Sequence, residues 1–117
     1  MKDVWSEIAQ ELERARRARE SGKEGQARVC ARRAAGMAIR AYYARRGKPP
    51  STSSAYDLLR WLAEDEQVNA ETRARALRLT LRVTPEFKLP MEADLIQDAE
   101  ELARSLLGDQ EKVTGER

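Results

Sequence analysis

Arginine is the reactive side chain that this sequence supplies in quantity. Of its 117 residues 17 are Arg, histidine is absent, and the only cysteine is Cys30. Without histidine the chain cannot form a Ser-His-Asp or Cys-His nucleophilic system, and no imidazole can act as a general acid or base. A zinc site needs several Cys or His ligands, and a disulfide needs two cysteines. These absences exclude histidine-based catalysis, a zinc site and a disulfide, and any remaining chemistry could come from carboxylates, arginines, lysines or hydroxyls. We assign no catalytic residue, no metal site and no cofactor.

Three arginines are spaced so that they share one face of a helix. Arg75, Arg78 and Arg82 follow one another at intervals of three and four residues, along one ridge. A guanidinium group binds phosphate through two parallel hydrogen bonds, so this ridge is a candidate nucleotide- or phosphate-binding site. The alternative is a solvated helix face, in which Glu71 pairs with Arg75 four residues later.

Three further residues are weaker candidates for the same chemistry. Lys48 lies in a loop after a basic helix end, where cations also suit the negative end of the helix dipole. Tyr56 could stack on a base, although contact with the core edge or a second subunit explains it as well. Asp57 could act as an acid or a metal ligand, although a carboxylate near a helix start also stabilises the positive end of the dipole.

Apolar side chains recur at the 3.6-residue period of helices, and these helices must position the candidate groups. Ser53 or Ser54 is expected to cap one helix and Asn69 another. The sequence predicts an all-α fold, a single-domain antiparallel bundle of about five helices over residues 3–108, and a polar C-terminal tail over residues 109–117. The predicted helices are about Val4–Glu20, Lys23–Arg46, Ala55–Glu64, Ala70–Val83 and Met91–Leu107.

The predicted second helix is expected to be the central one. Alanines dominate half of its circumference, which allows neighbouring helices to approach closely. The other half is basic but interrupted by apolar residues, so we expect it to meet either the acidic fifth helix or a second subunit. Its basic residues are Arg28, Arg32, Arg33 and Arg40, its interrupting residues are Val29, Ile39 and Tyr43, and the expected acidic partners are Asp94, Asp98 and Glu101.

The apolar residues of the predicted first and fourth helices form clear stripes. The first has one stripe, and the fourth has two, with the arginine ridge between them. The stripe of the first helix is Trp5, Ile8, Ala9, Leu12 and Ala15; those of the fourth are Ala70, Ala74, Leu77 and Leu81, and Ala76, Leu79 and Val83.

Charge is unevenly distributed along the chain. The formal net charge is +2, yet residues 21–48 carry eight positive side chains against one negative, and residues 84–117 carry four against nine. The near-neutral total argues against a domain that coats nucleic acid. No apolar run approaches the roughly 18 residues that span a membrane, and the polar N-terminus is unlike a signal peptide. A lone Cys30 fits a reducing compartment, so we expect a cytoplasmic protein.

Three segments together resemble the HEPN superfamily (higher eukaryotes and prokaryotes nucleotide-binding domain). The Ala-rich segment 34–43 ends in Tyr42 and Tyr43 before a Pro-containing loop. Segment 54–59, Ser-Ala-Tyr-Asp-Leu-Leu, opens a short helix, and segment 82–86, Arg-Val-Thr-Pro-Glu, is similar to the family's Arg-aromatic-Pro-acid ending. The resemblance spans about residues 3–108 and implies a small all-helical domain.

The resemblance also bears on function, because one residue of the family's ribonuclease motif is missing from this chain. Ribonuclease members of the superfamily carry an Arg followed four to six residues later by His, and this chain has no His. It therefore resembles the non-nucleolytic branch, whose members form homodimers, partner a minimal nucleotidyltransferase in toxin-antitoxin-like pairs, or bind a nucleotide or RNA phosphate. Arg82 falls on the family motif, although Val83 replaces the usual aromatic residue. The alternatives are a divergent ribonuclease that acts without histidine, and a purely structural assembly protein.

Overall fold

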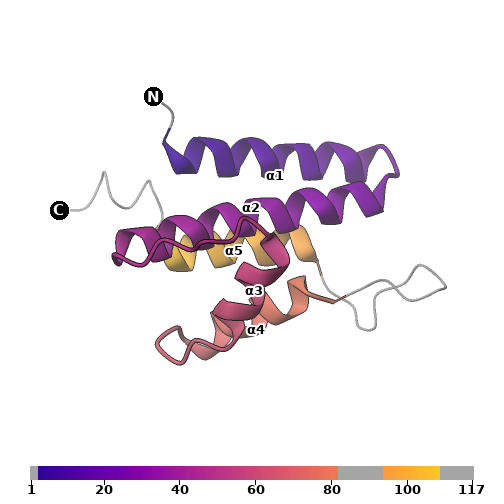
Figure 1. Ribbon diagram of the computed structural model, residues 1–117. Helices are drawn as coiled ribbons and strands as arrows, with labels where there is room; N and C mark the ends of the chain where they lie inside the picture. The colour runs from indigo at the N-terminus through magenta and orange to yellow at the C-terminus, as the bar shows by residue number, and fades with distance from the viewer. Residues whose placement is uncertain (1–2, 82–93, 109–117) are drawn as a thin grey trace.

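Five helices form the fold in the computed structural model, which describes residues 3–81 and 94–108 (Figure 1). Within those two ranges there is no strand, so the predicted all-α class is confirmed. The predicted tail, residues 109–117, lies outside the described residues. The helices are α1 (Val4–Glu20), α2 (Glu24–Arg45), α3 (Ala55–Ala63), α4 (Ala70–Leu79) and α5 (Leu95–Leu107).

Side-chain caps set the start of four of these helices. The caps of α3 and α4 are Ser54 and Asn69, as expected, and each accepts a hydrogen bond from the backbone N–H three residues later. Asp3 caps α1 and Asp94 caps α5 in the same way. Each cap satisfies one of the backbone donors that a helix start leaves unpaired, so the sequence itself fixes these boundaries.

Helix α4 is shorter than predicted, since it ends at Leu79 and not at Val83. The Thr80 hydroxyl donates to the Leu77 carbonyl oxygen, and Arg32 of α2 donates to the carbonyl oxygens of Leu79 and Leu81, at 2.7 Å each. These donors satisfy carbonyl groups at the helix end, so the chain can leave the helix there. Smaller corrections are that α2 is one residue shorter at each end than predicted and α3 one residue shorter at its end. Helix α5 begins at Leu95, after its cap Asp94, and not at Met91.

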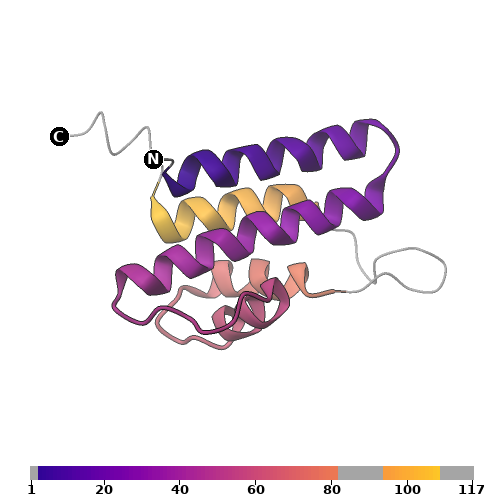
Figure 2. The same cartoon turned by 45° about the horizontal axis from the view of Figure 1, so that its top comes forward.

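Helix α2 lies at the centre of the bundle, as expected. It packs against α1, α3 and α5, whereas α4 packs against α3 and α5; Figure 2 shows the three long helices α1, α2 and α5 with the shorter α3 and α4 below them. Helix α1 runs antiparallel to α2 and to α5, whereas α2 and α5 run parallel, because the short α3–α4 pair lies between them in the chain. The Trp5 indole N–H donates to the Gly108 carbonyl oxygen at 3.2 Å and so joins the first helix to the end of the last.

The basic half of α2 is covered within the chain only in part. Ile39 is fully buried within the chain, so the expectation that a second subunit covers it is wrong. Gly36 of the same helix packs against Ala55 of α3. Val29 is exposed. In the first helix, Ala9 is also exposed and does not belong to the buried stripe.

The arginines of α2 do not pair with the acids that the sequence suggested. Arg28 lies 3.8 Å from Glu24 and Arg33 lies 3.7 Å from Glu11. Arg40 donates to the Thr52 carbonyl oxygen, and Arg32 to those of the α4 end. The acids of α5 are instead paired by α1 and α4, because these helices flank α5 with their own arginines: Arg19 with Asp94, Arg16 with Glu100, and Arg78 with Asp98.

Replacing Gly36 with valine is expected to lower the free energy of unfolding by about 1–3 kcal/mol. A Cβ atom at this position would lie 3.2 Å from the Cβ atom of Ala55, closer than ordinary contact. The matched control is Gly25→Ala in the same helix, where nothing lies within 4 Å of the added atom; it is expected to raise the stability by up to about 1 kcal/mol. Urea unfolding measures both, and a neutral Gly36→Val would contradict the close α2–α3 packing.

Candidate functional site

Two of the three predicted ridge arginines converge on one buried acid. Arg78 of α4 binds the carboxylate of Asp98 on α5 through two hydrogen bonds, Nε to Oδ2 at 2.9 Å and Nη2 to Oδ1 at 2.8 Å. Arg75 lies beside it, with Nε 4.0 Å from Asp98 Oδ1 and Nη2 3.1 Å from Glu71 Oε2. The Asp98 side chain is only 10% exposed. The hydrogen bond to Asp98 raises the pKa of Arg78, so the guanidinium group stays charged.

The guanidinium groups of Arg75 and Arg78 therefore bind carboxylates of the protein itself. A bidentate carboxylate occupies the donors of Arg78 that a phosphate would use. The Glu71–Arg75 pair that the sequence offered as the alternative is present. Arg82 lies outside the described residues, so its place on the ridge stays a prediction.

A groove borders this cluster between α4 and α5. Its volume is about 590 Å³. Thr72 and Ser105 share a hydrogen bond of 2.6 Å there, between α4 and α5. Arg104 lies 2.9 Å from Glu100, so its charge is balanced within α5. The groove is lined by Asn69, Glu71, Thr72, Arg75, Glu101, Arg104, Ser105 and Gly108.

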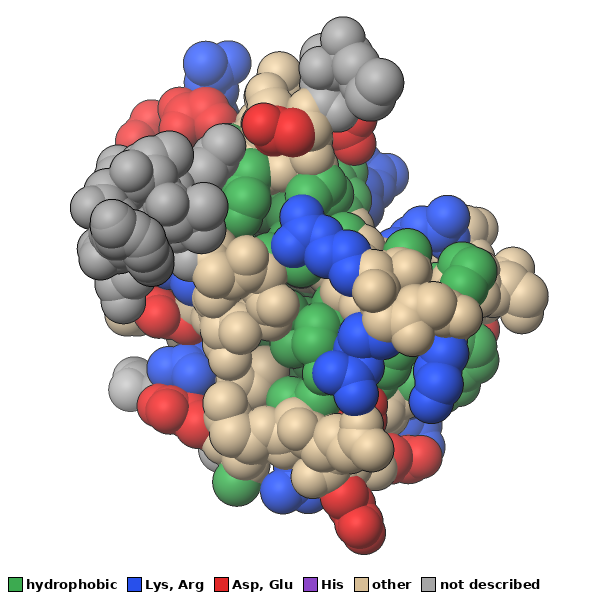
Figure 3. Space-filling view, turned by 90° about the vertical axis from the view of Figure 1, so that its left-hand side faces the viewer, with side chains coloured by type: hydrophobic (Ala, Val, Ile, Leu, Met, Phe, Trp, Pro, Cys, Tyr) green, Lys and Arg blue, Asp and Glu red, His purple; other side chains and the backbone are tan. Residues whose placement is uncertain are grey.

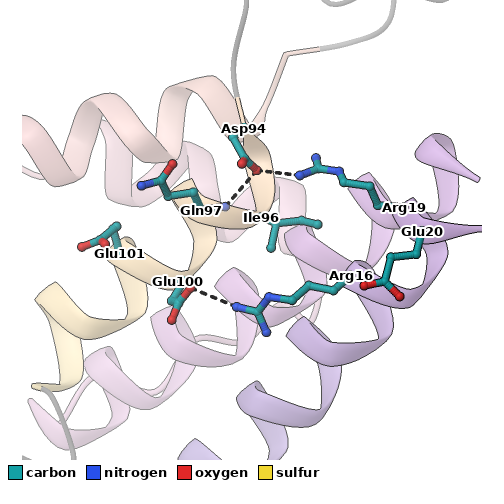
Figure 4. Close-up of a pocket in the computed structure, with 8 residues that line it drawn as sticks. All are labelled: Arg16, Arg19, Glu20, Asp94, Ile96, Gln97, Glu100 and Glu101. Atoms are coloured by element: carbon teal, nitrogen blue, oxygen red, sulfur yellow. Dashed lines mark hydrogen bonds and ion pairs between the residues drawn. The ribbon is translucent and has the colours of Figure 1, made fainter. Parts of the chain in front are cut away.

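A second cleft of about 410 Å³ lies between α1 and α5 (Figure 4). Arg19 and Arg16 reach across it from α1, to Asp94 and Glu100 respectively, at 3.0 Å each. Burial alone would raise the pKa of Asp94, but hydrogen bonds from Arg19 and a backbone N–H outweigh it, so the pKa is lowered. Four acids and two arginines line the cleft, and this excess of negative charge disfavours an anionic ligand.

Lys48 belongs to a different cluster, at the end of α2. The Tyr43 hydroxyl donates to Asp65 Oδ2 at 2.7 Å, and this bond is the largest of the effects that lower the pKa of Asp65, to which Arg46 and Lys48 add by their charge. Figure 3 views this end of the bundle, where Lys and Arg side chains gather to the right of a central group of hydrophobic side chains. The charges of Lys48 and Arg46 therefore stabilise the ionised Asp65 carboxylate that Tyr43 binds.

Replacing Tyr43 with phenylalanine is expected to cost about 1 kcal/mol of stability near neutral pH. Because the folded pKa of Asp65 is lowered, its contribution is present above the unfolded pKa near 4 and is lost as the pH falls through the folded value. Burial and the bond to Asp65 raise the pKa of Tyr43. The stability that the Tyr43 hydroxyl contributes is therefore present below the unfolded pKa near 10 and is lost as the pH rises from there toward the folded value. Urea unfolding across pH measures the difference between the two proteins, and a difference independent of pH would contradict this account.

Tyr56 and Asp57 lie at the start of α3 and make local contacts. Asp57 donates its backbone N–H to Ser54 Oγ and accepts from the Thr52 hydroxyl at 3.3 Å, as the helix-start alternative expects. Arg60 lies over the Tyr56 ring, 5.9 Å from its centroid, and donates to the Tyr56 hydroxyl. These contacts account for both residues without a ligand.

Large hydrophobic side chains are exposed mainly on α3 and α4. Among the described residues the exposed ones are Tyr56 and Trp61 of α3, Leu77 of α4 and Val29 of α2. Leu77 has the largest exposed fraction, 57%. Of the two predicted α4 stripes, the one with Ala76 and Leu79 is buried, and the one with Leu77 faces outward.

Asp98 is the site residue whose partner sequence reasoning missed. The acid was expected to meet α2, whereas it binds α4. One signal could have found it, since Asp98 falls among Leu95, Ala99 and Leu102 on the apolar face of α5, and a buried acid requires a cation beside it. Glu11 is a similar case, 3% exposed in the apolar stripe of α1 and paired with Arg14 at 3.0 Å.

Comparison with known proteins identifies the fold family. In the described part of the chain, no three His, Cys, Asp or Glu side chains are placed to hold a metal ion, and no helix there is long and apolar enough to cross a membrane. No curated protein and no solved structure matches the sequence. The family model of the HEPN domain matches residues 2–115, which is nearly the whole chain. The chain therefore belongs to the HEPN family, as its sequence resemblance and all-helical fold had indicated.

Proposed function

We propose that this chain is a non-catalytic HEPN module that acts by protein association, as a homodimer and as the partner of a minimal nucleotidyltransferase in a toxin-antitoxin-like pair. One observation carries the proposal: three of the four large hydrophobic side chains exposed in the described residues lie on the neighbouring helices α3 and α4. Exposed apolar and aromatic side chains gathered on one part of a surface are typical of protein interfaces. With its one cysteine buried and free, the module is proposed to work in the cytoplasm.

The state of the arginines supports association over nucleotide binding. To bind a phosphate, Arg78 would have to release a nearly buried carboxylate, and an unpaired buried charge is costly. The missing histidine supports the non-catalytic half of the proposal, because the ribonuclease motif of the family requires it.

Nucleotide binding is the second candidate, and the α4–α5 groove is the place that favours it. Arg75 and Arg104 both line this groove beside the start of α4, where backbone N–H groups favour an anion. A nucleotide phosphate would have to compete there with Glu71 and Glu100 for the two guanidinium groups.

Calorimetric titration separates the two candidates. The purified chain is titrated with ATP and with the product of its neighbouring gene, which we propose to be a minimal nucleotidyltransferase. We expect saturable binding of the protein and none of ATP. Saturable ATP binding that Arg75→Ala abolishes and Arg16→Ala retains would overturn the proposal in favour of the groove. Cleavage of RNA by the chain, lost in Arg82→Ala, would instead establish the divergent ribonuclease.

A further inference from the structure

Helix α4 carries an apolar stripe that the bundle does not cover. Ala70, Ala74 and Leu77 are exposed, and Leu81 continues the stripe just beyond the helix end, partly exposed. Their spacing of four, three and four residues is that of a seam between two packed helices. The buried side of the same helix is formed by Thr72, Ala76 and Leu79, so the stripe faces away from the core.

The stripe is complementary to itself in an antiparallel arrangement. Its first half is small, with two alanines, and its second half is large, with two leucines. A two-fold axis passing near residues 75 and 76 would place Leu77 against Ala74 of a second copy, and Leu81 against Ala70 of that copy. Large side chains would then fill the space above small ones, which is how packed helices interdigitate.

Charge along one edge of the stripe follows the same symmetry. Glu71 lies beside the small half and its carboxylate side chain is 75% exposed. Arg78 lies on the same edge beside the large half, and its side chain is 33% exposed although it binds Asp98. The antiparallel arrangement brings Glu71 of each copy toward Arg78 of the other, so the two edges attract each other.

The size of the surface predicts a weak and concentration-dependent association. A stable interface buries about 800 Å² on each partner, more than one short helix face supplies. The rest must come from neighbouring elements, and α3 packs against α4 and exposes Trp61 and Tyr56. Aromatic rings at such positions contribute strongly to binding.

We infer that a second copy of this chain docks on the outward stripe of α4, formed by Ala70, Ala74, Leu77 and Leu81, with the two α4 helices antiparallel. The inference rests on the homodimer of the proposed function and assigns its face. Because Arg75 and Arg78 point toward α5 from the edge of this stripe, the dimer would also shield the Asp98 cluster from solvent.

Sedimentation equilibrium of the full chain over a wide concentration range tests the inference. Leu77→Asp and Ala74→Asp are each expected to raise the dimer dissociation constant about tenfold or more. The matched control is Ala9→Asp, an exposed helix alanine on α1, on the far side of the bundle from α4 (Figure 1). It makes the same substitution and is expected to leave the constant unchanged. Circular dichroism confirms that all three variants are folded.

The outcomes separate the docking face from the proposed function. If the wild type dimerises and both α4 variants match Ala9→Asp, the dimer stands but the α4 face is wrong. If the wild type is a monomer at every concentration, both the face and the homodimer are overturned. If only the two α4 variants lose the dimer, the inference holds.

Disulfide trapping tests whether the two α4 helices are antiparallel. Two cysteines join only when their Cα atoms lie within about 7 Å. A mixture of Ala74→Cys and Leu77→Cys chains is expected to cross-link faster than either variant alone, because these positions oppose each other across the two-fold axis. Cys30 is buried, so the wild type serves as the uncross-linked control. Equal cross-linking in the mixture and in the single variants would overturn the antiparallel register.

Discussion

Replacing Asp98 with alanine is expected to lower the free energy of unfolding by about 2–4 kcal/mol. The substitution removes both hydrogen bonds to Arg78 and leaves Arg75 beside it without the shared acid. Each guanidinium group is partly buried, with side-chain exposures of 33% and 19%, so water replaces the lost carboxylate only in part. Denaturant unfolding of the purified variant measures the loss.

Glu100→Ala is the matched control for Asp98→Ala. Glu100 also accepts from two arginines of its surroundings, Arg16 at 3.0 Å and Arg104 at 2.9 Å, but its side chain is 28% exposed. Its two arginines are 42% and 46% exposed, and pairs with exposed partners contribute about 0–1 kcal/mol. If Asp98→Ala cost no more than Glu100→Ala, the cluster would not be the structural ion pair that we describe.

Replacing Leu102 with alanine is expected to cost about 3 kcal/mol or more. Leu102 is fully buried on α5, the helix that packs against α1, α2 and α4. Truncation there leaves a cavity among packed helices, and the surrounding side chains cannot close it fully. Thermal or urea unfolding gives the free energy directly.

Leu77→Ala makes the same chemical change at an exposed position. Measured at a dilution where the chain is monomeric, it is expected to change the stability by less than about 0.5 kcal/mol. A cost close to that of Leu102→Ala would mean that the outward stripe of α4 is covered within one chain, contrary to its 57% exposure at Leu77.

Local signals made the helices predictable. The start of α3 follows from Ser54 and that of α4 from Asn69, because a cap acts on backbone groups three residues away. The end of α4 did not follow in the same way. It depends on Arg32, 47 residues earlier than Leu79, whose carbonyl oxygen it binds, and no local pattern reports such a contact.

Side-chain partners were less predictable than helices. Periodicity showed that α4 has two apolar stripes but could not tell whether Leu77 or Leu79 faces the core, since both are leucines on a short helix. It also could not tell which arginine meets Asp98, because that depends on which helix lies beside α5. Helix α4 packs against α5 and so brings Arg78 to Asp98.

Sedimentation velocity of the chain, alone and mixed with the product of its neighbouring gene, the proposed minimal nucleotidyltransferase, tests most directly whether the chain acts by association. We expect a dimer that sediments together with the nucleotidyltransferase as one complex. A chain that sediments as a monomer at every concentration, unchanged by the second protein, would contradict it.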